Sequence, residues 1–190
     1  YCKREAMSAL TGLKVLDLSR VLAGPWCGMM LADLGAEVIK VESFDGDDTR
    51  GMGPPYIGGI SAYFSCANRG KRSICIDLHQ PESAEIIHAL GRQADVLGEN
   101  FRTGTAERLG VGYAALSAVN PRLIYCSISG YGRIGPDAER AGYDYAVQAE
   151  GGLMAITGAR DGAPNKVAVA VVDLATGQNA AIAIPAALNQ

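Results

Sequence analysis

The amino-acid sequence predicts an α/β fold, a doubly wound and largely parallel sheet with helices on both faces. Short apolar runs of the kind found in buried strands alternate along the chain with segments of helical periodicity. Of the 190 residues, 48% are apolar and 19% are charged, so the chain can bury a sizeable core. The 24 glycines indicate many tight turns between short elements.

The first predicted elements form a β-α-β unit. Residues 13–19 are expected to be a short buried strand, and Pro25 suits the first turn of a helix that continues through residues 26–34. Gly35 ends this helix, and Glu37–Glu42 follows as a second strand. Such a unit implies parallel pairing through a right-handed crossover.

The alternation continues to the end of the chain. Further strands are expected at residues 73–78, 95–98, 123–128 and 166–172. Helices are expected at residues 81–93, 105–109, 113–119 and 173–189, the last of them beginning with Asp173. Because no polar tail follows this apolar last helix, we expect further elements to cover it and the chain to be truncated.

The loops indicate where a ligand binds. Residues 43–59 and 129–142 form long loops rich in glycine and proline, and such loops lie at strand ends, where open α/β sheets bind ligands. A dinucleotide site would require G-x-G-x-x-G after the first strand. Residues 22–26 read LAGPW and lack this pattern, so we do not expect NAD binding.

Charge and cysteine content argue against several classes of function. The formal net charge is −3, whereas nucleic acids and anionic membranes require a basic surface. No stretch approaches the roughly 20 apolar residues that a membrane span requires. The five cysteines are scattered without a C-x-x-C pair, so we expect no metal site and a reducing, cytoplasmic environment.

Asp173 allows two interpretations. Aspartate is a favoured N-cap, which would make its role purely structural. A carboxylate at a helix N-terminus, ahead of Thr176 and Gly177, also stays ionised and lies beside free backbone N–H groups. Such a carboxylate can attack a thioester while the N–H groups stabilise the oxyanion.

Two basic features of the sequence also allow two interpretations each. Residues 69–72 (RGKR) form either an ordinary solvated turn or a site for phosphate groups. Arg108 is either a cation at a helix C-terminus or a phosphate ligand. The two histidines, His79 and His88, do not support a Ser-His-Asp or Cys-His arrangement.

Six segments, in this order, resemble the class III CoA-transferase family, also called the L-carnitine dehydratase and bile-acid-inducible protein family. They are residues 10–42, 68–77 (NRGKRSICID), 99–110 (ENFRTGTAERLG), 120–135 (NPRLIYCSISGYGRIG), 141–158 and 171–188. The resemblance implies that residues 10–190 are the amino-terminal part of a Rossmann-like CoA-binding domain, without the small domain and the C-terminal return. Residues 1–9 are then expected to be a non-native or flexible segment.

The resemblance also implies roles for individual residues. Asp173 would be the nucleophile, forming an aspartyl anhydride and then an aspartyl-CoA thioester before CoA passes to an acceptor carboxylic acid. CoA and acyl-CoA would be substrates, with no prosthetic group. His79 and Ser43 stand where members often carry lysine and some carry arginine, which implies weaker or relocated phosphate contacts. The implied CoA contacts are Val21, Ala23, Ile76, His79, Asn100, Phe101, Arg102 and Arg108, with Tyr143 near the thioester and Leu22 on an apolar wall.

Two alternatives stay open. Racemases of the same family pair the aspartate with a histidine in a Gly-His-Asp stretch. Here the stretch is Gly142-Tyr143-Asp144, and tyrosine is not a base near neutral pH, so transfer is favoured. The other alternative is an inactive module that only binds CoA or assembles with partners. The resemblance and the apolar last helix together imply a homodimer or higher oligomer.

Overall fold

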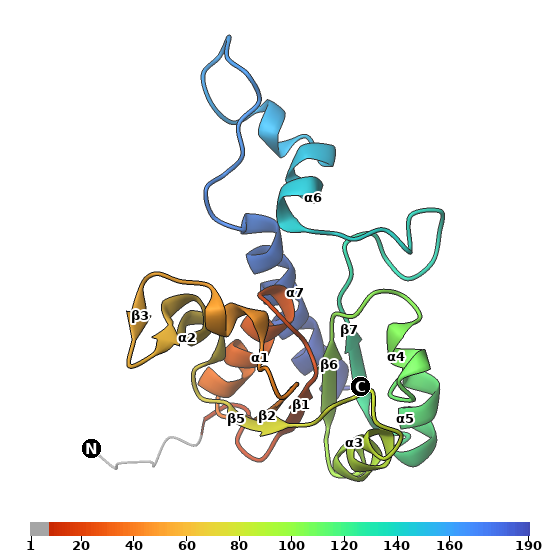
Figure 1. Ribbon diagram of the computed structural model, residues 1–190. Coiled ribbons are helices and arrows are strands. Elements are labelled where there is room, and N and C mark those ends of the chain that lie inside the picture. Colours follow the sequence, from red (N-terminus) through yellow and green to blue (C-terminus); the bar gives the residue numbers. More distant parts are fainter. Residues whose placement is uncertain (1–7) are drawn as a thin grey trace, which may run out of the picture.

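A five-stranded parallel sheet forms the centre of the computed structural model, which describes residues 8–190 (Figure 1). Every neighbouring pair in this sheet is parallel, which confirms the predicted fold class. The order is β5-β2-β1-β6-β7. The strands are β1 (Lys14–Asp17), β2 (Glu37–Glu42), β5 (Arg72–Cys75), β6 (Val96–Glu99) and β7 (Ile124–Ser127).

The strand order creates a crevice between β1 and β6. From β1 the chain builds outward through β2 and β5, whereas from β6 it builds the other way through β7. The loops that follow β1 and β6 therefore diverge at the carboxyl ends of the strands, which is where open α/β sheets bind ligands.

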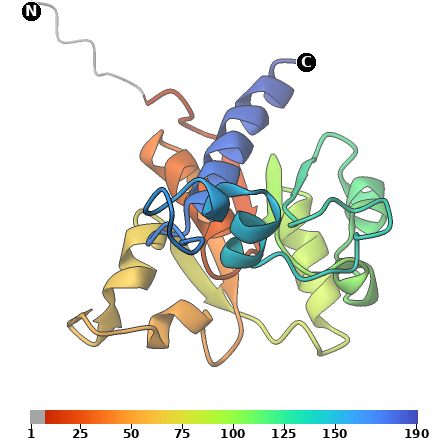
Figure 2. The same cartoon turned by 90° about the horizontal axis from the view of Figure 1, so that it is seen from above.

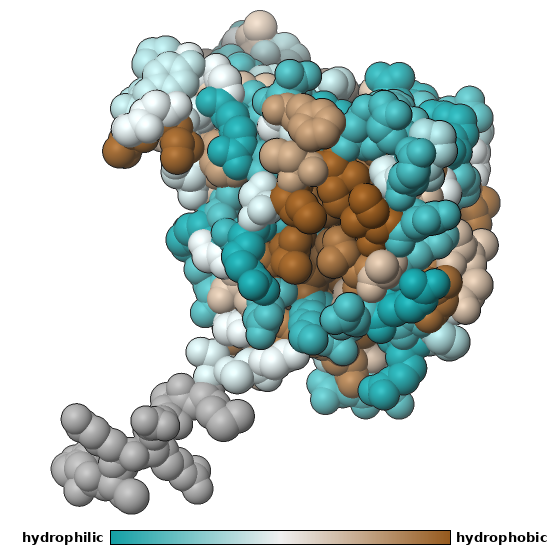
Figure 3. All heavy atoms as spheres, turned by 60° about the horizontal axis from the view of Figure 1, so that its bottom comes forward, coloured by the Kyte–Doolittle hydropathy of each residue, from teal (hydrophilic) through white to brown (hydrophobic). Residues whose placement is uncertain are grey.

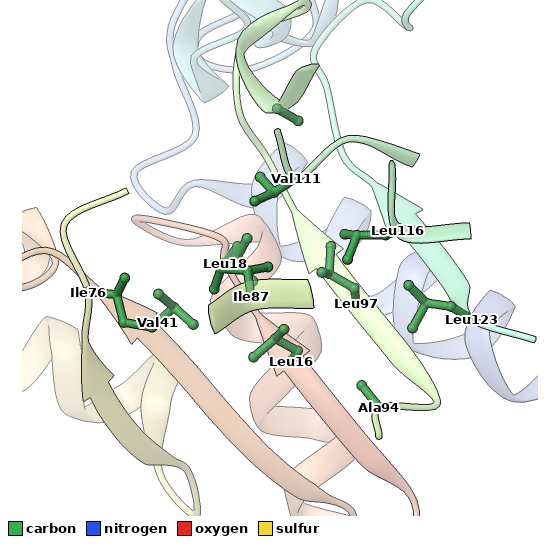
Figure 4. Close-up of a cluster of buried hydrophobic side chains, with 11 residues drawn as sticks. Leu16, Leu18, Val41, Ile76, Ile87, Ala94, Leu97, Val111, Leu116 and Leu123 are labelled. Atoms are coloured by element: carbon green, nitrogen blue, oxygen red, sulfur yellow. The ribbon is translucent and has the colours of Figure 1, made fainter. Parts of the chain in front are cut away.

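Helices cover both faces of the sheet, as predicted. Side chains alternate along a strand, so Val15 and Leu16 of β1 enter different cores. The Val15 core contains residues of α1 (Ala23–Asp33) and α7 (Val171–Leu188), which lie side by side in Figures 1 and 2. The Leu16 core, shown in Figure 4, contains residues of α3 (Ser83–Gly91) and α5 (Tyr113–Val119).

The remaining elements are short. Beyond β2 lie the 3-10 turn η1 (Asp48–Gly51), a hairpin of β3 (Tyr56–Ile57) and β4 (Ile60–Ser61), and α2 (Ala62–Asn68). The helix α4 (Thr105–Arg108) follows β6. The helix α6 (Asp144–Glu150) and the 3-10 turn η2 (Leu153–Ala155) project beyond the carboxyl ends of the strands in Figure 1.

The expected strand at residues 166–172 is wrong. Its backbone bonds to the side chain of Gln148 in α6: the Val167 N–H donates to Oε1 at 2.9 Å and the Val169 carbonyl accepts from Nε2 at 3.4 Å. The helix α7 then begins at Val171, two residues before the expected start. This apolar run therefore pairs with no neighbouring strand, and the Gln148 side chain bonds two of its backbone groups instead.

The expectation of a non-native or flexible segment at residues 1–9 is tested by the structure only at residues 8 and 9. Residues 1–7, which make up most of the segment expected to be non-native or flexible, lie outside the described residues. From residue 8 onward the chain joins the fold, since the Ser8 carbonyl accepts from the Thr11 N–H at 3.1 Å and the Leu10 N–H donates to Leu34 at 2.9 Å. The proposed boundary between residues 9 and 10 stays a prediction.

Apolar surface remains exposed on the described part of the chain. Figure 3 shows an apolar area surrounded by polar residues on the side that lies at the bottom of Figure 1. A hollow of about 170 Å³ at the amino ends of β1 and β2 has Ile39 and Leu90 in its lining. Contrary to the sequence-based expectation, α7 is long and apolar enough to span a membrane by length and composition alone. One side of α7 packs on the sheet and α1, but only 17% of the helix is buried, and Ile182 is 68% exposed.

Candidate active site

Asp173 lies in the first turn of α7 and lines two adjoining hollows at the carboxyl end of the sheet. The larger hollow measures about 390 Å³ and the smaller about 130 Å³. Residues that line both hollows come from α1, from α7, from the loop after β6 and from the loop before α6. They are Ala23, Asn100, Arg102, Ala141, Gly142 and Asp173.

The N-cap interpretation of Asp173 is wrong. The N-cap position of α7 is Ala170, and Asp173 is the third helical residue. The capping carboxylate comes from α6: Asp144 Oδ1 accepts from the backbone N–H groups of Val172 at 2.8 Å and Asp173 at 3.2 Å. Gln148 Nε2 donates to the other oxygen of Asp144 at 2.5 Å. The structural task is thus done by Asp144, and the carboxylate of Asp173 remains available to the hollows.

Burial sets the charge state of Asp173. Desolvation, and secondly the negative charge of Asp144, raise the pKa of Asp173 to about 6. Asp173 is therefore mostly ionised at neutral pH, yet its proton affinity is well above that of an ordinary aspartate. Burial, and secondly the charge of Asp173, also raise the pKa of Tyr63 in α2 to about 12. Tyr63 is therefore a neutral hydroxyl in the same electrostatic environment.

A glycine allows the two helix N-termini to meet at the site. Gly177 is one turn after Asp173 and is buried against α1. An added Cβ at Gly177 would lie only 2.5 Å from the carbonyl oxygen of Ala23 and 3.1 Å from Trp26 Cβ. Ala23, the first residue of α1, lines both hollows, and the first turn of α1 holds no acidic residue, so the positive end of this helix dipole is directed toward them. At α7 the carboxylate of Asp144 already accepts the first N–H groups.

The loop between β1 and α1 is held in a strained conformation. Val21 has a φ of 67°, and it is the one non-glycine residue with positive φ among residues 8–190. This conformation is costly for a β-branched residue and persists only when its surroundings impose it. Asp47 Oδ2 accepts the Val21 N–H at 3.2 Å, and Asn100 bonds both backbone groups of Arg20, at 2.8 and 2.7 Å. The wall of the larger hollow is thus fixed before any ligand arrives.

A family model described as CoA-transferase family III matches residues 10–190. The chain belongs to this family. Succinate–glutarate CoA-transferase of Agrobacterium fabrum is 51% identical over 186 residues, which cover 94% of this chain and 46% of that protein. Human succinyl-CoA:glutarate CoA-transferase is 50% identical over 182 residues, covering 95% of this chain and 42% of that protein. The chain spans about half the length of the curated relatives it matches.

The solved structures agree with this assignment. A CAIB/BAIF family protein from Brucella suis has a TM-score of 0.92 and 52% sequence identity to this chain. The match covers 95% of this chain and 49% of that one. The sheet and helices described above are therefore those of a class III CoA-transferase family member.

Most of the nine residues for which the family resemblance implies a contact to CoA lie around the larger hollow. Asp173 and six of the nine line the larger hollow, namely Val21, Ala23, Asn100, Phe101, Arg102 and Tyr143. Ile76 is buried in the Leu16 core and His79 lies exposed, and neither belongs to the lining of this hollow. Arg108 is also outside the lining, but its Nη2 donates to Thr105 Oγ1 at 2.8 Å, and Thr105 is in the lining. Their contacts to CoA stay predictions.

The basic turn at residues 69–72 lies away from both hollows. Arg69 pairs with Asp33 at the end of α1, and Arg72 pairs with Glu37 at 3.2 Å at the amino end of the sheet. Lys71 is buried, and its Nζ contacts Asp17 Oδ2 at 2.8 Å. The phosphate-site interpretation of this turn therefore finds no support, because the three cations already have carboxylate partners.

Several residues of the hollow were not assigned from the sequence. Arg20, Asp48 and Thr105 line the larger hollow, with Arg20 and Asp48 paired at 2.6 Å. Asp48 belongs to the long loop at residues 43–59, and Ala141 and Gly142 lie at the end of the loop at residues 129–142. The composition of these loops indicated a ligand site, but it could not show which side chains face it. Among residues 8–190 no group of His, Cys, Asp or Glu side chains is arranged to hold a metal ion.

Proposed function

We propose that this chain is the CoA-binding half of an acyl-CoA:carboxylate CoA-transferase in which Asp173 is the nucleophile. The observation that supports this most is the place of Asp173, whose carboxylate lines both hollows while another carboxylate caps its helix. Coenzyme A would occupy the larger hollow as substrate. The positive end of α1, whose first residue Ala23 lines both hollows, favours the negative charge that develops on a thioester oxygen under attack.

The proposed reaction is a double displacement. An oxygen of the Asp173 carboxylate attacks the thioester carbonyl, the carbon–sulfur bond breaks, and CoA leaves as thiolate to give an acyl-aspartyl anhydride. The thiolate then attacks the aspartyl carbonyl, releasing the first acid as its carboxylate and leaving CoA on Asp173 as a thioester. An acceptor carboxylate reverses both steps, so that the new acyl-CoA departs and the Asp173 carboxylate is restored.

The placement of the histidines favours transfer over racemisation. A racemase of the proposed type requires a histidine beside the aspartate. His79 is exposed outside the hollow, and His88 Nε2 bonds the carbonyl of Gly110 at 2.7 Å. The position next to Asp144 is Tyr143, which lines the larger hollow. An inactive CoA-binding module remains the other outcome of the test below.

We propose short dicarboxylic acids as the acyl groups. The relatives named above act on succinate and glutarate by their names. Arg102 lines both hollows, and no ion pair joins it to another of the described residues. A free guanidinium at this place suits a second carboxylate or a phosphate of CoA. We further propose that the whole protein is a cytoplasmic homodimer or higher oligomer, since the apolar side chains of Ile182 and Leu188 on α7 are exposed.

A transfer assay with the full-length protein tests this function. Succinyl-CoA and isotopically labelled glutarate are mixed with the enzyme, and labelled glutaryl-CoA is followed by mass spectrometry. We expect labelled glutaryl-CoA together with free succinate. Binding of CoA without any transfer, for these and other short acids, would support the inactive module instead.

Transfer should weaken in acid. Only the ionised form of Asp173 attacks, and burial and Asp144 raise its pKa to about 6. The value of kcat/KM is therefore expected to be level above pH 7 and to fall toward tenfold per pH unit below pH 6. An Asp144→Asn variant should shift this limb to lower pH, because asparagine still accepts the N–H bonds but removes the negative charge. If kcat/KM fell over the same pH range in both proteins, the assignment of this fall to Asp173 beside Asp144 would be contradicted.

A further inference from the structure

Arg133, in the loop between β7 and α6, donates five hydrogen bonds within the protein. Its Nε donates to Ser127 Oγ at 2.7 Å, and its Nη1 donates to the carbonyl of Phe101 at 2.6 Å. Its Nη2 donates to both oxygens of Glu99, at 2.8 and 3.0 Å, and to the carbonyl of Ile128 at 3.2 Å. One guanidinium therefore joins the carboxyl ends of β6 and β7.

The partner carboxylate completes the arrangement. The Glu99 side chain is 2% exposed, and its Oε2 accepts the N–H of Phe101 at 2.7 Å. The N–H and the carbonyl of Phe101 are thus both fixed, one by Glu99 and the other by Arg133. Thr103 Oγ1 donates to the carbonyl of Ala138 at 2.6 Å, which ties the same two loops together a second time.

The segment held in this way forms the wall of the candidate site. Asn100, Phe101 and Arg102 line the larger hollow, whereas Arg133 is in the lining of neither hollow. Asn100 in turn bonds the backbone of Arg20, next to the strained Val21. Arg133 therefore supports the loop after β6 directly, and through Asn100 that loop contacts the one after β1.

We propose that Arg133 is a positioning residue for CoA binding. It holds residues 100–102 in the conformation that contacts CoA, without touching the substrate itself. The inference rests on the function proposed above. Only arginine offers five donors in a planar fork, so lysine can keep the charge but not the set of contacts.

Titration of the full-length protein with CoA, followed by transfer kinetics, tests this role. For Arg133→Lys we expect about a tenfold increase in the Kd of CoA and in the KM of acyl-CoA. This increase corresponds in free energy to the loss of roughly one strong hydrogen bond. We expect kcat per folded molecule to stay within about twofold, because Asp173 is held by α6 and α7 instead. Loss of folding alone would lower the active fraction and leave KM unchanged.

Two further variants keep the test decisive. Arg122→Lys is the matched control, since Arg122 is exposed before β7 and lies outside both hollows; it should bind CoA like the wild type. Should Arg133→Lys fail to fold, Ser127→Ala removes the contact to Nε and the hydrogen bond from Ser127 Oγ to Glu99. It leaves the other four hydrogen bonds of Arg133 in place and should give a smaller increase in Kd. Unchanged CoA affinity in folded Arg133 and Ser127 variants would overturn the inference. A wild-type protein that binds no CoA would instead overturn the proposed function.

Discussion

An Asp173→Asn variant of the full-length protein should fold, bind CoA with near-normal affinity and lose transfer by about 10⁴-fold or more. A neutral amide cannot attack a thioester as a carboxylate does, so neither the anhydride nor the thioester can form. Steady-state transfer from succinyl-CoA and a CoA titration on the same preparation measure the two properties. Asp161→Asn, in an exposed loop outside both hollows, is the matched control and should keep full activity.

The same variant should be more stable than the wild type at neutral pH. The pKa of Asp173 in the folded protein is about 6, above the ordinary value of 3.8, so the folded state binds its proton more tightly than the unfolded state does. The ionised form therefore costs stability, and this cost develops as the pH rises from about 4 to about 6. Removing it should add about 1–2 kcal/mol to the free energy of unfolding, allowing for solvent screening at a partly open site. Wild-type transfer by a stable Asp173→Asn protein would refute the nucleophile assignment.

Lys40→Met should destabilise the fold by about 3–5 kcal/mol, because it leaves a buried carboxylate without its partner. Lys40 Nζ lies 2.9 Å from Asp47 Oδ2 and donates to the carbonyl of Ser19 at 2.8 Å. The two side chains of the pair are 2% and 0% exposed. Asp47 also accepts the N–H of Val21, so the strained loop at the hollow should loosen with it. Urea unfolding measured by circular dichroism reports the change in free energy.

An exposed ion pair provides the control for Lys40. The side chains of Arg72 and Glu37 are 69% and 55% exposed, and such pairs contribute about 0–1 kcal/mol. Arg72→Met should therefore change the free energy of unfolding by less than about 1 kcal/mol. Equal effects of the two substitutions would contradict the description of Lys40–Asp47 as a buried support of the site.

The sequence predicted the sheet well because strands that are buried on both faces of a sheet appear in the sequence as short, continuous apolar runs. Strands β1, β2 and β6 read as short apolar runs, and Pro25 and Gly35 bound the region of α1. The prediction failed at residues 166–172, where a short apolar run is also typical of a buried strand. In the structure Gln148, which lies about 20 residues earlier, bonds the N–H of Val167 and the carbonyl of Val169 through its side chain.

Site residues were predictable to the extent that they lie in segments that resemble the family. Val21, Asn100 and Asp173 were assigned through this resemblance, and the structure places them around one hollow. The residues that hold the site in place were not predictable, because Asp144 and Arg133 act through hydrogen bonds to backbone groups far away in the sequence. No local pattern distinguishes a capping aspartate that belongs to another helix from an ordinary surface carboxylate.

The most direct test of the account is a search for the covalent intermediate on Asp173. The full-length protein is incubated with succinyl-CoA, without acceptor, then treated with hydroxylamine, digested and analysed by tandem mass spectrometry. The account predicts a hydroxamate on the peptide that contains Asp173 and at that residue, dependent on succinyl-CoA. Transfer that proceeds at a normal rate with the hydroxamate absent, or located at a different residue, would contradict it.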